Sequence, residues 1–430
     1  MSTTSFRDLV SYDIGGGWGT AEAEPGSSSI GFVIRGTDIP RVATGDVSTV
    51  PLRFHKASNL GSRVLAPGDI VFEVSGGSSG QPVGRALQIT DKILGKFDEP
   101  VMCASFCKLV RIDPTRAIPG YIFRLLQAAY ADGGLDTYQV QSTGITNFKW
   151  KPFLDHFEVD LPTRYEQQQV ASILDVFDDL IENNRRRVEV LEEMARTIYR
   201  EWFVKFRYPG HADVPLVDSA LGPIPSGWDI APVSDVIAVN PRIKLDKSVE
   251  HPFIAMGDLD ERTMSCRPSQ VRTGGSGAKF VQGDTLFARI TPCLENGKTG
   301  LVQRLAVGEV GLGSTEFIVL RGRAVGSAFT YCLARESDFR KHAIASMSGA
   351  SGRQRVRNEC FDTYLLPVPS RDIADAFESS MDSVFSQVAV LTDEAEQLRH
   401  LRDLLLPKLV TGQIDVSTLD LDALVGDRVA

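Results

Sequence analysis

The sequence predicts an α+β protein in which one unit, a mixed α/β globular domain followed by a long helix, occurs twice. Three observations support this fold class. Short motifs recur at matching places in the two halves, two segments keep a heptad repeat of apolar residues, and a segment rich in proline and glycine separates the halves. We expect the two helices to form an antiparallel coiled coil, with the two copies related by a pseudo-twofold axis.

The duplication is visible at five matching points along the chain. The offset between matched residues drifts from 215 to 207, as loop insertions and deletions after a duplication would produce. The matched pairs are Gly68-Asp69 with Gly283-Asp284, Phe106 to Leu109 with Phe317 to Leu320, Tyr121 to Leu125 with Phe329 to Leu333, Gly144 with Gly352, and Pro162 with Pro369.

These matches divide the chain into six segments. A linker is expected where prolines and glycines cluster between the copies, and the last segment is acidic. The segments are a first globular domain (1–160), a first long helix (161–208), a linker (209–227), a second globular domain (228–368), a second long helix (369–412) and a C-terminal tail (413–430).

Both helical segments carry apolar residues at alternating spacings of four and three. A period of 3.5 residues kept for about five heptads is typical of a coiled-coil seam, so we favour a partner helix over packing on the domain alone. Asn184 and Arg402 fill the single polar slot of each seam. The seam residues are Val170, Leu174, Phe177, Ile181, Val188, Leu191, Ala195, Ile198 and Trp202 in the first copy, and Phe377, Met381, Val384, Val388, Leu391, Ala395, Leu398, Leu405 and Leu409 in the second.

Each globular domain is expected to hold short helices beside a mostly antiparallel sheet. The apolar runs are brief and bounded by Gly, Asp or Pro, which indicates strands, and two longer apolar stretches indicate helices. The expected strands include 70–72, 109–110, 253–255 and 317–320, and the expected helices lie near 122–131 and 328–344.

The net charge of −9 argues against a simple basic DNA-binding protein, but the charge is unevenly distributed. Residues 371–430 hold five basic and twelve acidic residues, whereas residues 225–370 hold 18 basic and 15 acidic residues. A basic groove outside the last helix and tail therefore remains possible. The chain shows no apolar run of membrane-spanning length and no signal peptide, and its scattered cysteines favour a reducing, cytoplasmic environment.

No motif of a known catalytic or metal site is complete. The glycine-rich segment 15–19 lacks the third glycine of a dinucleotide loop, and Gly297-Lys298-Thr299 lacks the first glycine of a phosphate-binding loop. Asn240-Pro241 is followed by Arg242, so the active-site segment of an adenine methyltransferase is missing as well. We therefore expect a non-catalytic chain without a metal or cofactor of its own.

Two polar clusters at duplicated positions are candidates for DNA binding. Arginine can bind guanine bidentately, asparagine and glutamine can bind adenine, and basic side chains neutralise phosphates. A solvated face beside the start of each long helix remains the alternative, and Arg35, Arg41, Lys279 and Lys298 are further candidates. The proposed DNA-binding residues are Gln141, Ser142, Thr143, Asn147, Lys149 and Lys151 in the first half, and Arg289, Arg353, Gln354, Arg355 and Arg357 in the second.

An aromatic cluster of Trp202, Phe203 and Phe206 closes the first helical segment. These side chains either bind a partner protein or cap the coiled coil as part of the core. The sequence alone does not separate the two alternatives, because both would place large aromatic residues at the end of an amphipathic helix.

The chain resembles the specificity subunits of type I restriction–modification systems over nearly its whole length. The set and order of the motifs carry this resemblance, although Arg371-Asp372-Ile373 departs from the Glu-Gln pair expected after the second proline. The motifs are Leu161-Pro162, Glu166-Gln167-Gln168, Ile173-Leu174-Asp175, and the segments 199–206, 221–228, 283–289 and 406–412.

The resemblance implies that each globular part is a target recognition domain for one half of a split, asymmetric DNA site. The helices would set the spacing between the half-sites and dock two modification (methyltransferase) subunits that carry S-adenosylmethionine. Restriction (motor-nuclease) subunits, which use ATP and Mg²⁺, would complete the complex. The alternative from another class is a coiled-coil protein scaffold that does not contact DNA.

Overall fold

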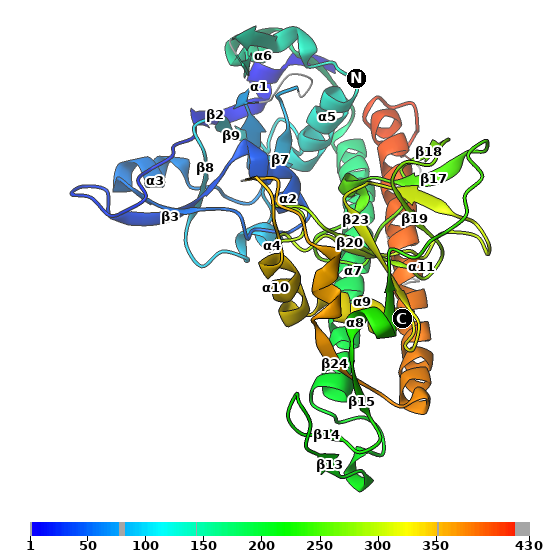
Figure 1. Ribbon diagram of the computed structural model, residues 1–430. Coiled ribbons are helices and arrows are strands. Elements are labelled where there is room, and N and C mark those ends of the chain that lie inside the picture. Colours follow the sequence, from blue (N-terminus) through cyan, green and yellow to red (C-terminus); the bar gives the residue numbers. More distant parts are fainter. Residues whose placement is uncertain (1, 77–81, 143, 351, 418–430) are drawn as a thin grey trace. The chain divides into compact units, whose positions relative to one another are not determined.

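The computed structural model describes residues 2–76, 82–142, 144–350 and 352–417 (Figure 1). The chain folds into two compact units. Unit 1 comprises residues 1–182 and 397–430, and unit 2 comprises residues 183–396. Each long helix therefore contributes one part to unit 1 and the other part to unit 2.

Unit 1 is built around two sheets, a short ribbon and a pair of terminal strands. The sheets pair antiparallel except for the parallel contact of β3 with β8. In order across each sheet, the strands are β2 (Val10–Gly15), β9 (Cys107–Ile112), β5 (Ile70–Glu73) and β7 (Ala86–Gln88); β4 (Leu52–His55), β3 (Ser29–Ile34) and β8 (Val101–Cys103); β10 (Gln139–Ser142), β11 (Ile145–Phe148) and β6 (Ser75–Gly76); and β1 (Ser2–Ser5) with β12 (Glu158–Leu161). The helices are α1 (Phe6–Leu9), α2 (Ile39–Ala43), α3 (Ala57–Arg63), α4 (Asp91–Leu94), α5 (Pro119–Ala131) and α6 (Trp150–His156).

Unit 2 repeats this topology. One four-stranded sheet of unit 2 has the same strand order as the four-stranded sheet of unit 1. The second sheet of unit 2 also contains a parallel pair, at its centre between β17 and β22, whereas the parallel pair of unit 1 lies at the edge of a three-stranded sheet. The strands are β16 (Ile237–Val239), β23 (Phe317–Gly322), β20 (Thr285–Ala288) and β21 (Thr299–Leu301); β18 (Gln270–Arg272), β17 (His251–Ile254), β22 (Gly311–Gly313) and β19 (Ala278–Phe280); β15 (Asp229–Pro232) with β24 (Leu365–Val368); and β13 (Leu216–Val217) with β14 (Ile224–Pro225). Its short helices are α8 (Val233–Val236), α9 (Ser327–Arg335) and α10 (Ser337–Ala345).

The duplicated Gly-Asp turns have the same structural role in both units. Asp69 and Asp284 are each 1% exposed and accept a backbone hydrogen bond from the residue three positions earlier, at 2.7 and 2.8 Å. Each also receives two hydrogen bonds from one guanidinium group, Arg111 in unit 1 and Arg321 in unit 2, at 2.6–2.7 Å. The motif is therefore a folding element, because a buried carboxylate needs such partners.

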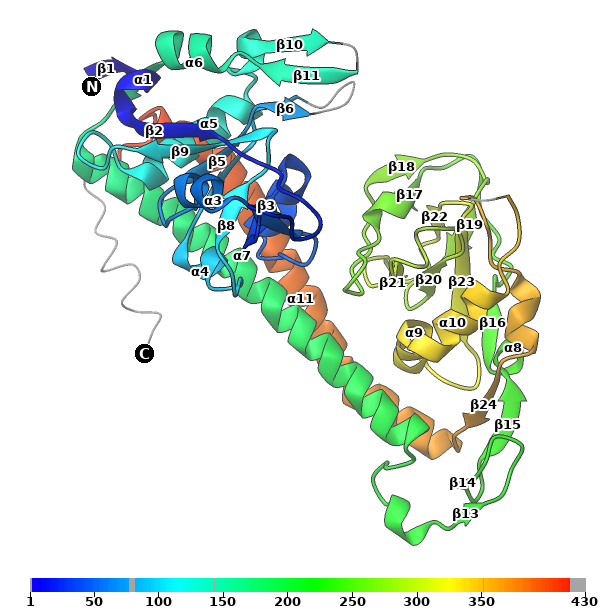
Figure 2. The same ribbon diagram turned by 90° about the vertical axis from the view of Figure 1, so that its left-hand side faces the viewer.

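The two long helices are α7 (Arg164–Tyr199), which continues into a π-helical turn at Arg200–Val204, and α11 (Arg371–Val410). At 1.5 Å per residue, α7 is about 54 Å long and α11 about 60 Å. Within unit 1, Val170 and Leu174 pack in one cluster with Leu406 and Leu409. Figure 2 shows the two helices side by side.

Within unit 2, the helices pack in opposite directions along their seam. Asn184 of α7 donates to Glu394 of α11 at 3.2 Å. Fifteen residues further along α7, Tyr199 contacts Phe377, which precedes Glu394 by seventeen residues in α11. The other polar slot, Arg402, donates to Asp178 at 2.6 Å within unit 1. The antiparallel coiled coil predicted from the heptads is thus confirmed, and both polar slots are satisfied by the facing helix.

The Glu166-Gln167 pair that follows the first proline has a structural role at the start of α7. Thr163 and Glu166 form reciprocal side-chain and backbone hydrogen bonds at 2.7–3.3 Å, which is a capping box. Gln167, 3% exposed, accepts from the backbone of Ile118 at 2.9 Å and so ties the domain to the helix. At the start of α11, Arg371 pairs with Asp375 instead, at 3.3 Å.

The expected strands and helices of the domains are confirmed, with one difference. The second apolar helical stretch is two helices, α9 and α10, because the backbone of Glu336 is extended between them (φ −65°, ψ 138°). Across the described residues, no helix is both long and apolar enough to span a bilayer.

Candidate nucleic-acid interface

In unit 1, the first polar cluster lies on a three-stranded ribbon formed by β10, β11 and β6 (Figure 2). Val140 pairs with Asn147, and Asn147 pairs with Ser75 on the other side. Asn147 also accepts a hydrogen bond from the hydroxyl of Ser75 at 2.8 Å. The ribbon therefore holds an asparagine side chain on its exposed surface in a fixed position.

Two aromatic residues of the same sequence cluster anchor the base of this ribbon. Phe148 and Trp150 are 7% and 8% exposed, and both pack on Phe72 with ring centroids 5.0 and 5.3 Å apart. The indole of Trp150 donates to Asp13 at 2.8 Å. These aromatic residues belong to the core, so they do not provide a stacking surface for bases.

The remaining residues predicted in this half differ in exposure. Gln141, Lys149 and Lys151 are exposed, and neither lysine forms an ion pair within the described residues. Thr143 lies outside the described residues, and for Ser142 only the backbone, in β10, is described. The exposed side chains alternate with Phe148 and Trp150, so one face of the cluster is available and the other is core.

The second cluster occupies the equivalent place in unit 2. Arg355 bridges to Ser348 on one side and Ile290 on the other, as Asn147 does to Val140 and Ser75. The backbone of Val356 donates to the carbonyl of Arg289 at 2.8 Å, as Phe148 donates to Val74 at 2.8 Å. The equivalence of the two clusters that the sequence predicted is confirmed at the level of the backbone.

The four predicted side chains of segment 353–357 are exposed but have different surroundings. Arg355 forms hydrogen bonds of 2.6–3.0 Å with the carboxylate of Glu316, and this partner lowers the pKa of Glu316. Arg357 donates to the hydroxyl of Ser348 at 2.9 Å. For Arg353 and Gln354, the described residues give only backbone contacts.

Arg289 is half-buried rather than exposed. One terminal nitrogen donates to the carbonyl of Val356 at 2.8 Å, which fixes the guanidinium beside the second cluster. Of the further candidates, Arg35 pairs with Asp38 at 2.8 Å and Lys298 donates to the carbonyl of Met256 at 2.9 Å. Neither is a freely presented cation.

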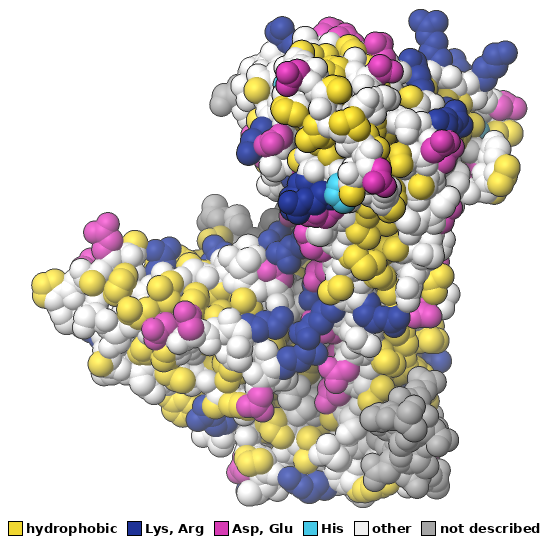
Figure 3. Space-filling model, turned by 90° about the horizontal axis from the view of Figure 1, so that it is seen from below, with side chains coloured by type: hydrophobic (Ala, Val, Ile, Leu, Met, Phe, Trp, Pro, Cys, Tyr) yellow, Lys and Arg dark blue, Asp and Glu magenta, His cyan; other side chains and the backbone are white. Residues whose placement is uncertain are grey.

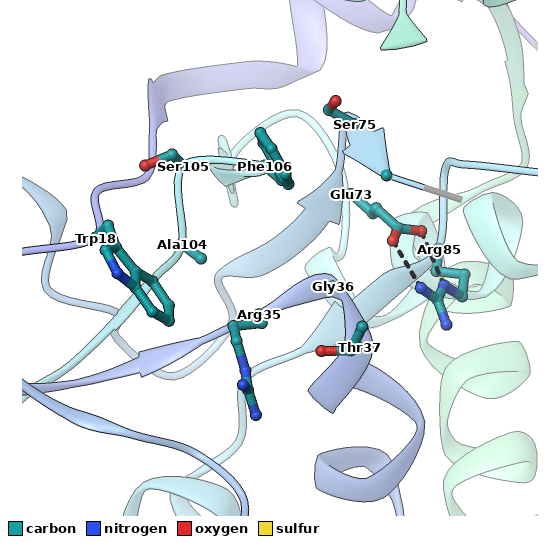
Figure 4. Close-up of a pocket in the computed structure, with 11 residues that line it drawn as sticks. Trp18, Arg35, Gly36, Thr37, Glu73, Ser75, Arg85, Ala104, Ser105 and Phe106 are labelled. Atoms are coloured by element: carbon teal, nitrogen blue, oxygen red, sulfur yellow. Dashed lines mark hydrogen bonds and ion pairs between the residues drawn. The ribbon is translucent and has the colours of Figure 1, made fainter. Parts of the chain in front are cut away.

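A cavity adjoins the polar cluster in each unit. In unit 1 the cavity has a volume of about 750 Å³ and lies between the ends of β3, β5 and β6 and the turn that joins β8 to β9 (Figure 4). In unit 2 the cavity has a volume of about 560 Å³ and includes Arg289 and the turn that joins β22 to β23. Each unit thus places a cavity beside its polar cluster, which lies on a three-stranded ribbon in unit 1 and on isolated bridges in unit 2.

Buried polar contacts that the sequence did not indicate tie the globular part of each unit to α7. In unit 1, Arg124 is 3% exposed and reaches Asp175 and Asp178 at 2.6 and 2.7 Å. In unit 2, Glu192 of α7 is 1% exposed and accepts from the Met264 backbone at 2.6 Å and from the Tyr331 hydroxyl at 2.8 Å.

Burial raises the pKa of Glu192 to about 7. No sequence signal distinguishes it from its exposed neighbour Glu193, except that it lies next to the seam position Leu191.

The aromatic cluster at the end of α7 belongs to the core of unit 2. Phe203 is 4% exposed and packs on Phe329 and Phe377 with centroids 4.7 and 4.9 Å apart. Trp202 and Phe206 are half-buried against the same core. Phe203 is therefore part of the core of unit 2, and partner binding by Trp202 and Phe206 stays a prediction.

Among the described residues, no group of His, Cys, Asp and Glu side chains is arranged to hold a metal ion. On the face shown in Figure 3, basic side chains are interspersed with acidic and apolar ones. This mixed surface is consistent with the net charge of −9. On this face, basic side chains would therefore offer local contacts to DNA rather than a broad basic field.

Comparison with known proteins shows similarity to one family. The chain is 24% identical over 278 residues to the type I restriction enzyme MjaIX specificity subunit of Methanocaldococcus jannaschii, a match that covers 62% of each chain. It is 28% identical over 181 residues to the EcoEI specificity subunit of Escherichia coli, which covers 40% of this chain and 30% of that protein. The matches therefore span less than two thirds of the length of these relatives. No protein-family model matches.

The fold has a solved counterpart. The crystal structure of the type I restriction–modification system S subunit from M. genitalium superposes with a TM-score of 0.53 at 14% identity, and covers 95% of both chains. The mixed helix-and-strand fold with two long helices is thus similar to the fold of that S subunit.

Proposed function

We propose that this chain is the DNA-recognition subunit of a type I restriction–modification complex, and that each unit reads one half of a bipartite site. The observation that carries this proposal is the repeat itself. Two units of equivalent topology each present a polar cluster beside a cavity, and two continuous helices run through both units. The similarity to named specificity subunits supports the same conclusion.

The two half-sites should differ in sequence, because equivalent positions carry different side chains. Asn147 of unit 1 corresponds to Arg355 of unit 2, and Lys149 corresponds to Arg357. Asparagine suits adenine, whereas arginine suits guanine, in the major groove. The site would therefore be asymmetric although the two units share one topology.

The chain itself would be non-catalytic. Two modification subunits would dock on the helices and bring S-adenosylmethionine and the adenine-methylating active site, and restriction subunits would bring ATP and Mg²⁺. The methylating subunit must turn its adenine out of the stack, and a rigid reader of both half-sites would hold the DNA for that step. We expect the complex to act in the cytoplasm.

Mapping methylated adenines in the host genome, with and without this gene, tests the proposal directly. We expect a split motif that is methylated only when the gene is present. Methylation that does not change on deletion of the gene would contradict the proposal.

A coiled-coil scaffold that does not touch DNA is the competing function. The purified complex separates the two, because a DNA reader loses affinity steeply as salt rises. Binding that is absent at low salt, or that does not change with salt, would favour the scaffold.

A further inference from the structure

We propose that the cavity of unit 2 is an anion site that holds one phosphate of the DNA backbone, and that the equivalent cavity of unit 1 is not. This inference rests on the proposed function and adds a difference in how the cavities of the two units interact with DNA. The cavity of unit 2 would hold DNA by ionic contact, whereas in unit 1 any ionic contact would come from side chains outside the cavity, such as Lys149 and Lys151.

Every polar side chain that lines the cavity of unit 2 offers a hydrogen-bond donor. Arg242 and Lys279 enter from the segment after β16 and from β19, and Arg289 enters from the end of β20. Asn240 and Thr315 add an amide and a hydroxyl. No carboxylate belongs to this described lining, so a phosphate would meet donors and positive charge on several sides.

Two details of hydrogen bonding leave donors for a ligand. The amide oxygen of Asn240 accepts from the Val319 backbone at 3.0 Å, which leaves its NH₂ group as the part that can face the cavity. The Nε of Arg289 is buried and has no hydrogen-bond partner among the described residues. A buried donor without a partner is costly, and an anion oxygen would satisfy it.

The backbone brings these elements close together at a glycine. Gly277, just before β19, has a φ of +105°, and a Cβ there would lie 2.1 Å from the carbonyl oxygen of Gly313. Only glycine allows this approach, and it sets the position from which Lys279 follows two residues later.

One carboxylate lies near the site, and it is already neutralised. Glu316 follows the lining residue Thr315 and is held by Arg355 at 2.6 Å. When the Arg355–Glu316 pair is added to the lining of the cavity, there are four basic groups and one acidic group. The basic groups are Arg242, Lys279, Arg289 and Arg355. The excess of positive charge is what an anion requires.

The cavity of unit 1 has the opposite character, although it occupies the equivalent place. Its two arginines are paired with buried carboxylates, Arg85 with Glu73 at 2.6 Å and Arg35 with Asp38 at 2.8 Å. Figure 4 shows the Glu73–Arg85 pair at one side of the cavity and the rings of Trp18 and Phe106 at the other. Its charges cancel, so it offers no net attraction for a phosphate.

The test compares two double variants of the full chain, assembled with its modification subunits if the chain alone does not bind DNA. R242Q/K279Q removes two cations of the cavity. R323Q/K341Q removes one arginine and one lysine from the exposed surface of the same unit, outside the cavity. Affinity for a 30-base-pair duplex of random sequence is measured by fluorescence anisotropy from about 50 to 200 mM salt.

We expect the slope of log K against log salt to fall in magnitude by about 0.9 in R242Q/K279Q, the value for one lost phosphate contact. The slope of R323Q/K341Q should stay that of the unmodified protein. Equal slopes for the two variants would overturn the inference. Circular dichroism checks that both variants are folded. In a separate measurement at low ionic strength, inorganic phosphate should raise the melting temperature of the unmodified protein but not that of R242Q/K279Q.

Once a target sequence is known, single phosphates can be replaced by neutral methylphosphonates. One position, in one half-site only, should weaken binding of the unmodified protein by about tenfold and leave R242Q/K279Q unaffected. If the complex binds its target specifically but no position behaves in this way, the inference fails while the proposed function stands. If the complex binds no DNA specifically, the proposed function itself fails.

Discussion

The buried carboxylate of Glu192 predicts a pH-dependent stability of unit 2 that a single substitution should remove. Glu192 is 1% exposed and receives hydrogen bonds from the Met264 backbone and the Tyr331 hydroxyl. In E192Q, the amide oxygen can accept from Met264 and the amide NH₂ can donate to the Tyr331 oxygen. The substitution therefore removes the charge while keeping the shape and both hydrogen bonds.

The magnitude follows from the pKa of this side chain. Burial raises it from 4.5 to about 7, although the hydrogen bonds and the charges of Arg335 and Arg196 act in the opposite direction. The folded protein therefore holds its proton at pH values where the unfolded chain has lost it. The free energy of unfolding should fall as pH rises from 4.5 to 7, by about 3 kcal/mol at 1.36 kcal/mol per pKa unit, and stay constant above pH 7.

Urea unfolding of the unmodified protein and E192Q at pH 5, 6, 7 and 8 measures this effect. The difference between the two cancels the titration of all other groups, so E192Q should gain stability relative to the unmodified protein with each step up to pH 7. E250Q, at an exposed glutamate of the same unit, is the matched control and should show no trend. A difference between the two proteins that does not change across this pH range would refute the reasoning.

Three further predictions concern DNA reading, the helices and the core. R353Q should weaken binding to one half-site by about 1–3 kcal/mol if the side chain contacts a base, as measured with duplexes altered in either half; an equal loss on all sequences would identify a phosphate contact instead. Deleting one heptad from both α7 and α11 shortens each helix by about 10 Å, so the methylated motif should show a shorter gap between its halves; an unchanged gap would show that the helices do not set it. F203A should destabilise unit 2 by roughly 3–5 kcal/mol in urea unfolding, because Phe203 is fully packed, and a near-neutral effect there would restore its assignment as a partner contact.

Much of the fold could be predicted because it depends on periodic patterns. The heptad residues, the duplicated Gly-Asp turns and the clusters before each long helix are visible in the sequence, and the structure places them at equivalent positions. The polar slots Asn184 and Arg402 were also visible, although their partners Glu394 and Asp178 were not. Partners more than 200 residues away cannot be found from spacing alone.

The candidate site could be predicted only in part, because exposure within a cluster depends on the path of the backbone. Trp150 looks like a stacking residue beside two lysines, but it turns inward because the ribbon packs on Phe72. Arg355 looks like a free cation, but Glu316, distant in sequence, neutralises it. The burial of Glu192 could not be predicted from its place beside the seam alone, because its hydrogen-bond partners Met264 and Tyr331 lie far along the chain.

The split of unit 1 between the two ends of the chain has a consequence for biosynthesis. Unit 2 is one continuous segment, whereas unit 1 is completed by residues after 396, which are synthesised after all of unit 2. Until then, the apolar side chains of Val170 and Leu174 lack Leu406 and Leu409, their partners in the cluster of unit 1. We therefore expect unit 2 to be able to fold before unit 1, because unit 1 gains its remaining helix segment only after residue 396 has been synthesised.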